Sequence, residues 1–351
     1  MGIIAAARLD SASVLIVFGA MQIATALRYG IPMPVQPLKA MAVLVIAQGI
    51  PGNVLLGAGL AIGATMLLLT ASGGVEWLAR AVPRSVVRGL QLGLGVQLGL
   101  LALRDYATSE GAVGYALAAA AFLLMLVLRG NHRLPPALPV IGLGVAYAAI
   151  FRPEAAAMAN GWDFALPRLH APSAGDVVTG FLVLAIPQIP LSLGNSLLAT
   201  QQITRDLFPE RAPGVRRIGF TYSLMNLASP WFGGVPVCHG SGGVAGHHAF
   251  GARTGGSLVV YGTLLLTAGL FFGPGFTTLV DVFPLPVLGV ILLWEALALL
   301  AVVRDSAGSA EEWSVVLLVG LLAAGLPYGY AVGMAVGTAL VYARRRWPGL
   351  I

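Results

Sequence analysis

Charged residues are scarce in this chain. Of its 351 residues only 10% are charged and 58% are hydrophobic, whereas soluble domains carry about 25% charged residues. A soluble fold has too little interior to cover that much apolar side chain, which excludes a soluble protein and predicts helices in a lipid bilayer. The chain also has a single cysteine, Cys238, so an intramolecular disulfide framework and a cysteine-rich metal site are excluded.

Lysine is almost absent. Nineteen of the twenty basic residues are arginine, and they lie between the apolar runs. They form no continuous basic face, which argues against a nucleic-acid-binding protein. If residues 344–346 lie in the cytoplasm, alternation of the spans leaves only four arginines outside, at positions 8, 104, 152 and 168. The sequence therefore predicts a multi-pass protein of the inner (plasma) membrane with a cytoplasmic C-terminus.

Apolar runs recur along the whole chain and predict about thirteen membrane elements. Two of them, 35–49 and 237–250, are too short and too polar for ordinary spans. The predicted elements are 12–28, 35–49, 54–71, 85–103, 111–128, 135–151, 176–199, 215–232, 237–250, 256–273, 285–303, 312–326 and 329–343.

The two short elements belong to an internal repeat. Met33-Pro34-Val35-Gln36-Pro37 resembles Val235-Pro236-Val237-Cys238-His239, and the two prolines Pro34 and Pro236 are 202 residues apart (236 − 34). A second resemblance, between 82–87 and 283–288, has nearly the same offset, which indicates a duplicated unit. Because an odd number of predicted elements follows the external loop at 152–172, the second repeat enters the membrane inverted.

The repeats are unequal in length. Two predicted spans, 176–199 and 215–232, precede the second proline motif, whereas only 12–28 precedes the first. The first repeat, 1–151, is therefore predicted to lack its first helix, with 2–7 as its remaining tail. The extracytoplasmic loop 152–172 and the second repeat, 173–351, complete the predicted organisation.

Both proline motifs predict a broken helix. Prolines cannot occupy a helix interior without losing backbone hydrogen bonds, so the chain before Lys39 must run extended and then start a half-helix. The glycines that follow His239 predict the same arrangement in the second repeat. Each helix N-terminus has about half a positive charge, and two of them at membrane depth predict an anion site.

Lys39 is the only lysine and lies in an apolar segment, where a charge is costly unless it is paired or functional. We expect it to bind the anion, with a structural ion pair or an interfacial position as the alternative. Further candidate donors with no negative charge are the side chains of Gln36, Cys238, His239 and Ser241 and the backbone of Gly240 and Gly242. His239 is equally well interpreted as a packed, neutral histidine.

Other polar residues at membrane depth are weaker candidates. Gln188 and Asn195 lie in a proline-broken polar stretch of 176–199 and are candidate wall residues, although buried amides often bond to neighbouring backbone instead. Glu295 is a candidate for carrying a coupling proton or for neutralising Lys39. Zinc sites need four well-spaced ligands, which the cysteine and histidines here do not supply, so no metal site is predicted.

Four stretches of the sequence are characteristic. They are Pro32-Met33-Pro34-Val35-Gln36-Pro37-Leu38-Lys39-Ala40, Pro236-Val237-Cys238-His239-Gly240-Ser241-Gly242-Gly243, Pro187-Gln188-Ile189-Pro190-Leu191 and Arg205-Asp206-Leu207-Phe208-Pro209. Together they resemble the molybdate transporter family related to the SulP sulfate permeases. The resemblance implies an all-α polytopic membrane protein with a seven-plus-seven inverted-repeat transporter fold and two short strand and half-helix segments. It further implies a core domain (12–71 with 173–273), a gate domain (83–151 with 284–346), and a substrate between 35–49 and 237–250. As in that family, and unlike most SulP permeases, no cytoplasmic STAS domain is expected.

The function expected from this resemblance is secondary transport of a small tetrahedral oxyanion, first of all molybdate, by elevator-like alternating access. Sulfate, tungstate or bicarbonate transport on the same fold, or a membrane protein that binds an oxyanion without transporting it, are the alternatives. No enzymatic activity and no cofactor are expected, and H⁺ or Na⁺ is left open as coupling ion. The expected partners are the oxyanion, membrane lipid and, through the gate domain, a second copy of the chain.

Overall fold

The computed structural model describes residues 2–129, 136–155, 162–249 and 251–347. Nearly all of the regular structure in these ranges is helical, and two strands of three residues each complete it. Six of the described helices are long and apolar enough to cross a membrane. The predicted class, an all-α polytopic membrane protein with two short strand segments, is thereby confirmed.

The chain divides into two compact units, and each unit combines parts of both repeats. One, which we call the ribbon unit because it contains the two strands, comprises 3–83 and 162–276. The other, the helical unit, comprises 1–2, 84–161 and 277–351. The transport roles predicted for these parts of the chain, core and gate, stay predictions.

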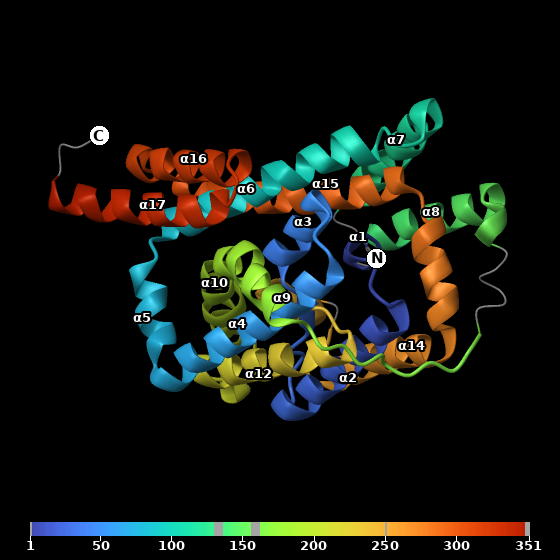
Figure 1. Cartoon of the computed structure of the whole chain (residues 1–351), viewed down its shortest axis with the longest axis horizontal. Helices are drawn as coiled ribbons and strands as arrows, with labels where there is room; N and C mark the ends of the chain where they lie inside the picture. The colour runs from blue at the N-terminus through green and yellow to red at the C-terminus, as the bar shows by residue number, and fades with distance from the viewer. Residues whose placement is uncertain (1, 130–135, 156–161, 250, 348–351) are drawn as a thin grey trace. The chain divides into compact units, whose positions relative to one another are not determined.

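The first repeat supplies six elements of the ribbon unit, coloured blue to cyan in Figure 1. They are α1 (Gly2–Ala7), α2 (Ser11–Tyr29), β1 (Val35–Pro37), α3 (Lys39–Gln48), α4 (Gly52–Ser72) and α5 (Gly74–Ala81). The Asp10 carboxylate caps α2 by accepting from the Ser13 amide, and α2 ends at Gly30, whose positive φ closes the last turn. The sequence does not predict α5, because this helix is short and has no apolar run.

The second repeat supplies the rest of the ribbon unit. Its elements are α9 (Ala174–Gly180), η3 (Phe181–Ala185), α10 (Ile186–Leu191), η4 (Ser192–Leu198), α11 (Ala199–Leu207), η5 (Pro209–Arg211), α12 (Val215–Ala228), η6 (Ser229–Phe232), β2 (Val237–His239), α13 (Ser241–Ala249) and most of α14 (Gly256–Val282). Residue Phe272 interrupts α14 with non-helical dihedral angles, next to Pro274. A proline at that place explains the kink, because its ring displaces the preceding turn.

One feature of this repeat differs from the prediction. The sequence predicts a span at 176–199 broken by prolines, whereas the helix runs without a break from Ala174 to Leu207. Pro187 and Pro190 lie inside α10, and the wider π-helical turns η3 and η4 flank them. Such turns change the hydrogen-bond pattern locally without ending the helix.

Helix α4 is the packing centre of the ribbon unit because it contacts both α9 and α12. Gly57 and Gly180 make this possible on the α9 side, since any side chain at either position would collide with backbone of the other helix. Gly63 has the same role against Leu227 of α12. Small residues at helix contacts let backbones approach closely, as is usual in membranes.

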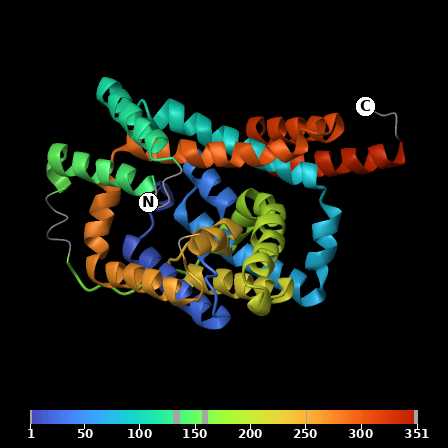
Figure 2. The ribbon, with the colours of Figure 1, turned by 180° about the vertical axis from the view of Figure 1, so that it is seen from behind.

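The helical unit consists of α6 (Arg84–Leu101), η1 (Ala102–Tyr106), α7 (Gly111–Val127), α8 (Ala137–Phe151), α15 (Leu285–Val302), η7 (Val303–Ser306), α16 (Ala310–Gly325) and α17 (Gly329–Arg346). Helices α6, α15, α16 and α17 lie side by side (Figure 1, Figure 2). Gly89 and Gly93 of α6 lie directly against Val319 and Ala323 of α16.

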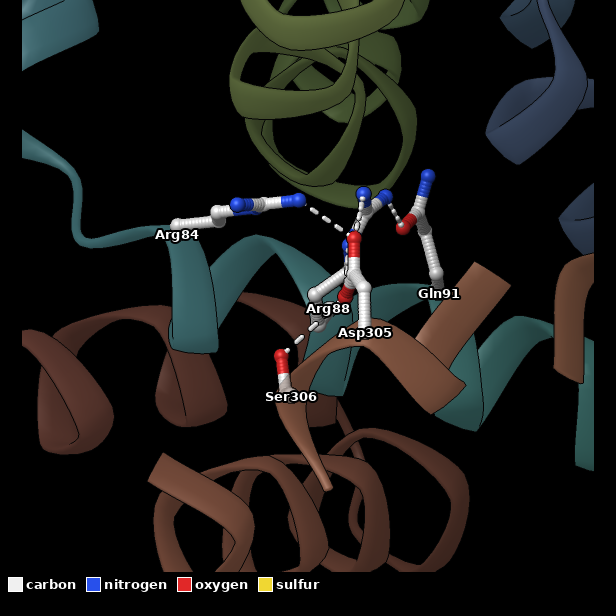
Figure 3. A network of polar contacts seen from close by, with 5 residues as sticks. All are labelled: Arg84, Arg88, Gln91, Asp305 and Ser306. Carbon is white, nitrogen blue, oxygen red and sulfur yellow. Dashed lines mark hydrogen bonds and ion pairs between the residues drawn. The ribbon is translucent and has the colours of Figure 1, made fainter. Parts of the chain in front are cut away.

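An ion-pair network links the start of α6 to η7, the short helix that follows α15, as Figure 3 shows. Arg84 donates to Asp305 Oδ2 at 2.5 Å, and Arg88 donates to both Asp305 oxygens, at 3.0 and 2.5 Å. Arg88 also donates to the Gln91 side chain at 2.8 Å. The network therefore connects α6 with η7 within the helical unit.

Candidate functional site

The two proline motifs come together as a two-stranded antiparallel ribbon. Strand β1 pairs with β2 so that Val35 lies opposite His239, Gln36 opposite Cys238 and Pro37 opposite Val237. The Leu38 amide extends the pairing by donating to the Pro236 carbonyl at 3.0 Å. The repeat offset in the sequence thus corresponds to direct contact in the fold.

A helix begins at each end of this ribbon. Helix α3 starts at Lys39, two residues after β1, and α13 starts at Ser241, two residues after β2. Because the strands are antiparallel, the two helix N-termini flank opposite ends of the ribbon, which spans about 10 Å for three residues. This geometry is what the prolines and glycines of the two motifs predict.

The N-terminus of α3 is capped by Gln188. Its Oε1 accepts from the amides of Ala40 at 2.9 Å and Met41 at 3.3 Å. Its Nε2 donates to Ser192 Oγ at 3.0 Å, and Ser192 in turn contacts the Tyr222 hydroxyl at 2.8 Å. Gln188 is buried and both ends of its amide are engaged. Gln188 therefore bonds to neighbouring backbone, which is the alternative weighed against a wall residue.

The N-terminus of α13 is different. Among the described residues, no side chain accepts a hydrogen bond from the Ser241 or Gly242 amide, whereas the next two amides, of Gly243 and Val244, bond back to the Gly240 carbonyl. Ser241 is partly accessible and Gly242 is exposed. The first two amide donors of α13 are thus available to a ligand.

Gln36 lies beside this open end of α13. A side chain at Gly240 or Gly243 would collide with the Gln36 amide, so the two glycines provide the space that Gln36 occupies. Gln36 itself is partly accessible. Its amide, the α13 N–H groups and the Ser241 hydroxyl therefore lie in one small region.

Lys39 is the first residue of α3, and its side chain is exposed in the structure. Its ammonium group is within electrostatic reach of Cys238 on β2. Cys238 is buried and hydrogen-bonds to the Ser196 side chain. The structure thus places Lys39 beside the ribbon, and its predicted role in anion binding stays a prediction.

His239 is a packed histidine. It is fully buried, with Nε2 at 3.0 Å from Thr221 Oγ1 and Nδ1 at 3.4 Å from the Pro34 carbonyl. A carbonyl can only accept, so Nδ1 donates to Pro34, while Nε2 shares its hydrogen bond with the threonine hydroxyl. Tyr29 meets the ring edge-on. Both ring nitrogens have partners in the protein, which fits the second of the two interpretations of His239.

Two further candidates are Asn195 and Glu295. The side chain of Asn195 lies outside the described residues. Glu295 is exposed on α15 in the helical unit, and its predicted coupling role stays a prediction. In the described part of the chain, no group of three or more histidine, cysteine, aspartate and glutamate side chains is arranged to hold a metal ion.

Two residues at the ribbon are missed by sequence analysis. Gln22 of α2 exchanges two hydrogen bonds with the backbone of Val35, at 2.7 and 2.9 Å. Asn226 of α12 does the same with Val237, at 2.7 and 2.8 Å. Both amides are fully buried. A single buried amide in each of two related apolar helices is the signal that points to them.

Comparison with known proteins places the fold and the motifs in a family. A family described as "Molybdate transporter of MFS superfamily" matches residues 1–98 and 180–299. Molybdate transporter 2 of Arabidopsis thaliana is 33% identical over 95% of this chain and 81% of its own length. Molybdate transporter 1 of Chlamydomonas reinhardtii is 27% identical over 99% of this chain and 91% of its own length.

Solved structures share the fold at lower identity. The transmembrane domain of the cyanobacterial bicarbonate transporter BicA superposes with a TM-score of 0.63 at 17% identity, covering 94% of this chain and 95% of that one. The murine Solute Carrier 26 family member A9 anion transporter in the inward-facing state gives a TM-score of 0.66 at 11% identity, covering 100% of this chain and 69% of that one. These likenesses show the seven-plus-seven inverted-repeat fold, and the sequence match shows that the chain belongs to the molybdate transporter family.

Proposed function

We propose that this chain is a secondary transporter that carries molybdate across the membrane. The observation that carries the proposal is the ribbon with a helix N-terminus at each end, because one of those N-termini presents unbonded amide donors. The family supports the substrate, since its named relatives are molybdate transporters. The protein spans the membrane many times, and we propose the inner (plasma) membrane with a cytoplasmic C-terminus.

The anion binds at α13 in this proposal. The amides of Ser241 and Gly242 donate to its oxygens, and the partial positive charge of the helix end adds to the attraction. Lys39 supplies a full positive charge, and Gln36 supplies a neutral amide donor. The α3 N-terminus contributes its dipole but not its second and third amides, because Gln188 occupies them.

Transport requires that the site face each side of the membrane in turn. We propose that the ribbon unit carries the anion and that the helical unit is the gate, as the elevator mechanism expected from the sequence requires. Glu295 and either H⁺ or Na⁺ are the proposed coupling elements, with no cofactor. A homodimer formed through the helical unit is part of the same proposal.

The test is uptake of labelled molybdate into proteoliposomes that contain the chain, with sulfate, tungstate and bicarbonate as competitors and protein-free vesicles as the control. The proposal is supported if labelled molybdate accumulates saturably and unlabelled molybdate is the strongest competitor of its uptake. Stronger competition by sulfate or bicarbonate than by molybdate would show that the preferred substrate is that anion and not molybdate. Saturable binding without accumulation, or no uptake of any of these anions, would overturn the proposal of transport.

A further inference from the structure

The two buried amides, Gln22 and Asn226, occupy the outer edges of the ribbon. In an antiparallel pair, the N–H and C=O of one residue point to the same side, and successive residues alternate. The carbonyl and amide of Val35 face Gln22, so they point away from β2. Those of Val237 face Asn226 and point away from β1 in the same way. Each amide side chain thus takes the place of a third strand.

The arrangement follows the internal repeat. Val35 and Val237 are 202 residues apart (237 − 35), which is the offset of the proline motifs. Gln22 lies on the helix before β1, and Asn226 lies on the helix before β2. The same bidentate contact is therefore built twice, once in each repeat, although the side chain is glutamine in one and asparagine in the other.

The ribbon depends on such contacts. Two strands of three residues are far below the size that is stable without support. At membrane depth, water is not there to satisfy their outer edges, so each unbonded amide or carbonyl is costly. A further outward-facing group, the His239 carbonyl, also has a partner, the hydroxyl of Thr200 at 3.3 Å.

We propose that Gln22 and Asn226 are positioning residues that hold the ribbon and so set where α3 and α13 begin. They lie on the side of the strands away from the partner strand and bond to backbone only, so they act on the anion through Lys39 and the α13 amides. The effect on transport rests on the proposed function. The effect on the ribbon itself does not, because it follows from the hydrogen bonds alone.

Cys238 gives a direct readout of the ribbon. It is the only cysteine in the chain, it lies at the centre of β2 and it is buried. The rate at which N-ethylmaleimide labels the wild-type chain therefore reports how often the ribbon opens. No cysteine has to be introduced or removed.

The test variants are Gln22→Met and Asn226→Leu, which keep the approximate size of each side chain and remove both hydrogen bonds to the strand, and in Asn226→Leu also the bond to the Tyr222 carbonyl of its own helix. Matched controls are Thr25→Val and Ser223→Ala, which lie on the same two helices, are buried, and lose only a hydroxyl bonded to a carbonyl of their own helix. We expect each test variant to raise the labelling rate of Cys238 by about tenfold or more, since two buried backbone groups lose their partners. The controls are expected to match the wild type. Labelling at the control rate in both test variants would overturn the inference.

A second pair of variants keeps the experiment decisive if the apolar variants do not fold. Gln22→Asn and Asn226→Gln retain the amide donor and acceptor but move them by one methylene, so the two hydrogen bonds to the strand lose their geometry. We expect labelling rates between those of the wild type and the apolar variants. Rates equal to the wild type in both of these variants would contradict the inference.

A transport measurement on the same variants distinguishes failure of this inference from failure of the proposed function. In proteoliposomes we expect Gln22→Met and Asn226→Leu to raise KM for molybdate about tenfold, with a smaller change in kcat, while Thr25→Val and Ser223→Ala retain the wild-type KM. If the wild type carries no oxyanion, the proposed function fails and the thiol result still decides the inference. If the wild type carries molybdate and the test variants have the KM of the controls, the inference fails and the proposed function stands.

Discussion

The N-termini of α3 and α13 come from the same repeated motif but end in different chemical states. At α3, a glutamine from a third helix accepts the amides of Ala40 and Met41. At α13, the amides of Ser241 and Gly242 have no such side-chain partner among the described residues. The duplicated motif thus has one closed helix end and one open helix end. If the proposed anion site is correct, only the open end binds the anion.

The largest effect is expected from filling the space beside the open end. A methyl group at Gly243 would collide with Gln36 and Pro34, whereas one at Gly246, a turn further along α13, meets nothing within 4 Å. Overpacking of this kind costs about 1–3 kcal/mol. We expect Gly243→Ala to weaken molybdate binding by about tenfold or more and Gly246→Ala to leave it unchanged, as measured by calorimetry. Equal affinities in the two variants would contradict the role of Gln36.

Removing the charge of Lys39 comes next. A hydrogen bond to a charged group contributes about 1.5–3 kcal/mol. Lys39→Gln is expected to raise KM for molybdate by at least about tenfold, and Lys39→Arg, which retains the charge, by less. Uptake at several molybdate concentrations measures both. A Lys39→Gln variant with the wild-type KM would place the binding charge elsewhere.

A substitution at the closed end, the N-terminus of α3, should change stability more than anion affinity. Gln188→Leu removes the cap of α3, which is expected to lower the free energy of unfolding by about 1–2 kcal/mol while changing the affinity for molybdate less than Gly243→Ala does. Thermal unfolding in detergent and calorimetry on the same sample give the two numbers. Loss of binding with no loss of stability would show that Gln188 contacts the anion directly.

The sequence predicts those features of the site that depend on neighbouring residues, and it does not predict contacts between residues far apart in the chain. The prolines around Val35 and the glycines after His239 are local signals, and they predict the strands and the helix starts. The repeat offset predicts that the two motifs correspond. The partners of Gln188 and His239 depend on how distant helices pack, which periodicity does not contain. For the same reason the sequence does not identify Gln22 and Asn226 as hydrogen-bond partners of the strands.

The smallest effect is expected from the Ser241 hydroxyl. If backbone amides make the main contacts, Ser241→Ala removes only one side-chain donor and should raise KM by less than about fivefold, because a neutral hydrogen bond contributes about 1 kcal/mol. Proteoliposome uptake measures this change. An increase as large as that of Lys39→Gln would mean that the side chain, and not the helix end, is the principal ligand.

The most direct test of anion binding at α13 is a structure of the chain determined with molybdate, whose molybdenum atom is easily located. We predict a tetrahedral density with oxygens about 3 Å from the amides of Ser241 and Gly242, and an undisturbed bond between Gln188 and Ala40. Density against Ala40 and Met41, with Gln188 displaced from them, would contradict it.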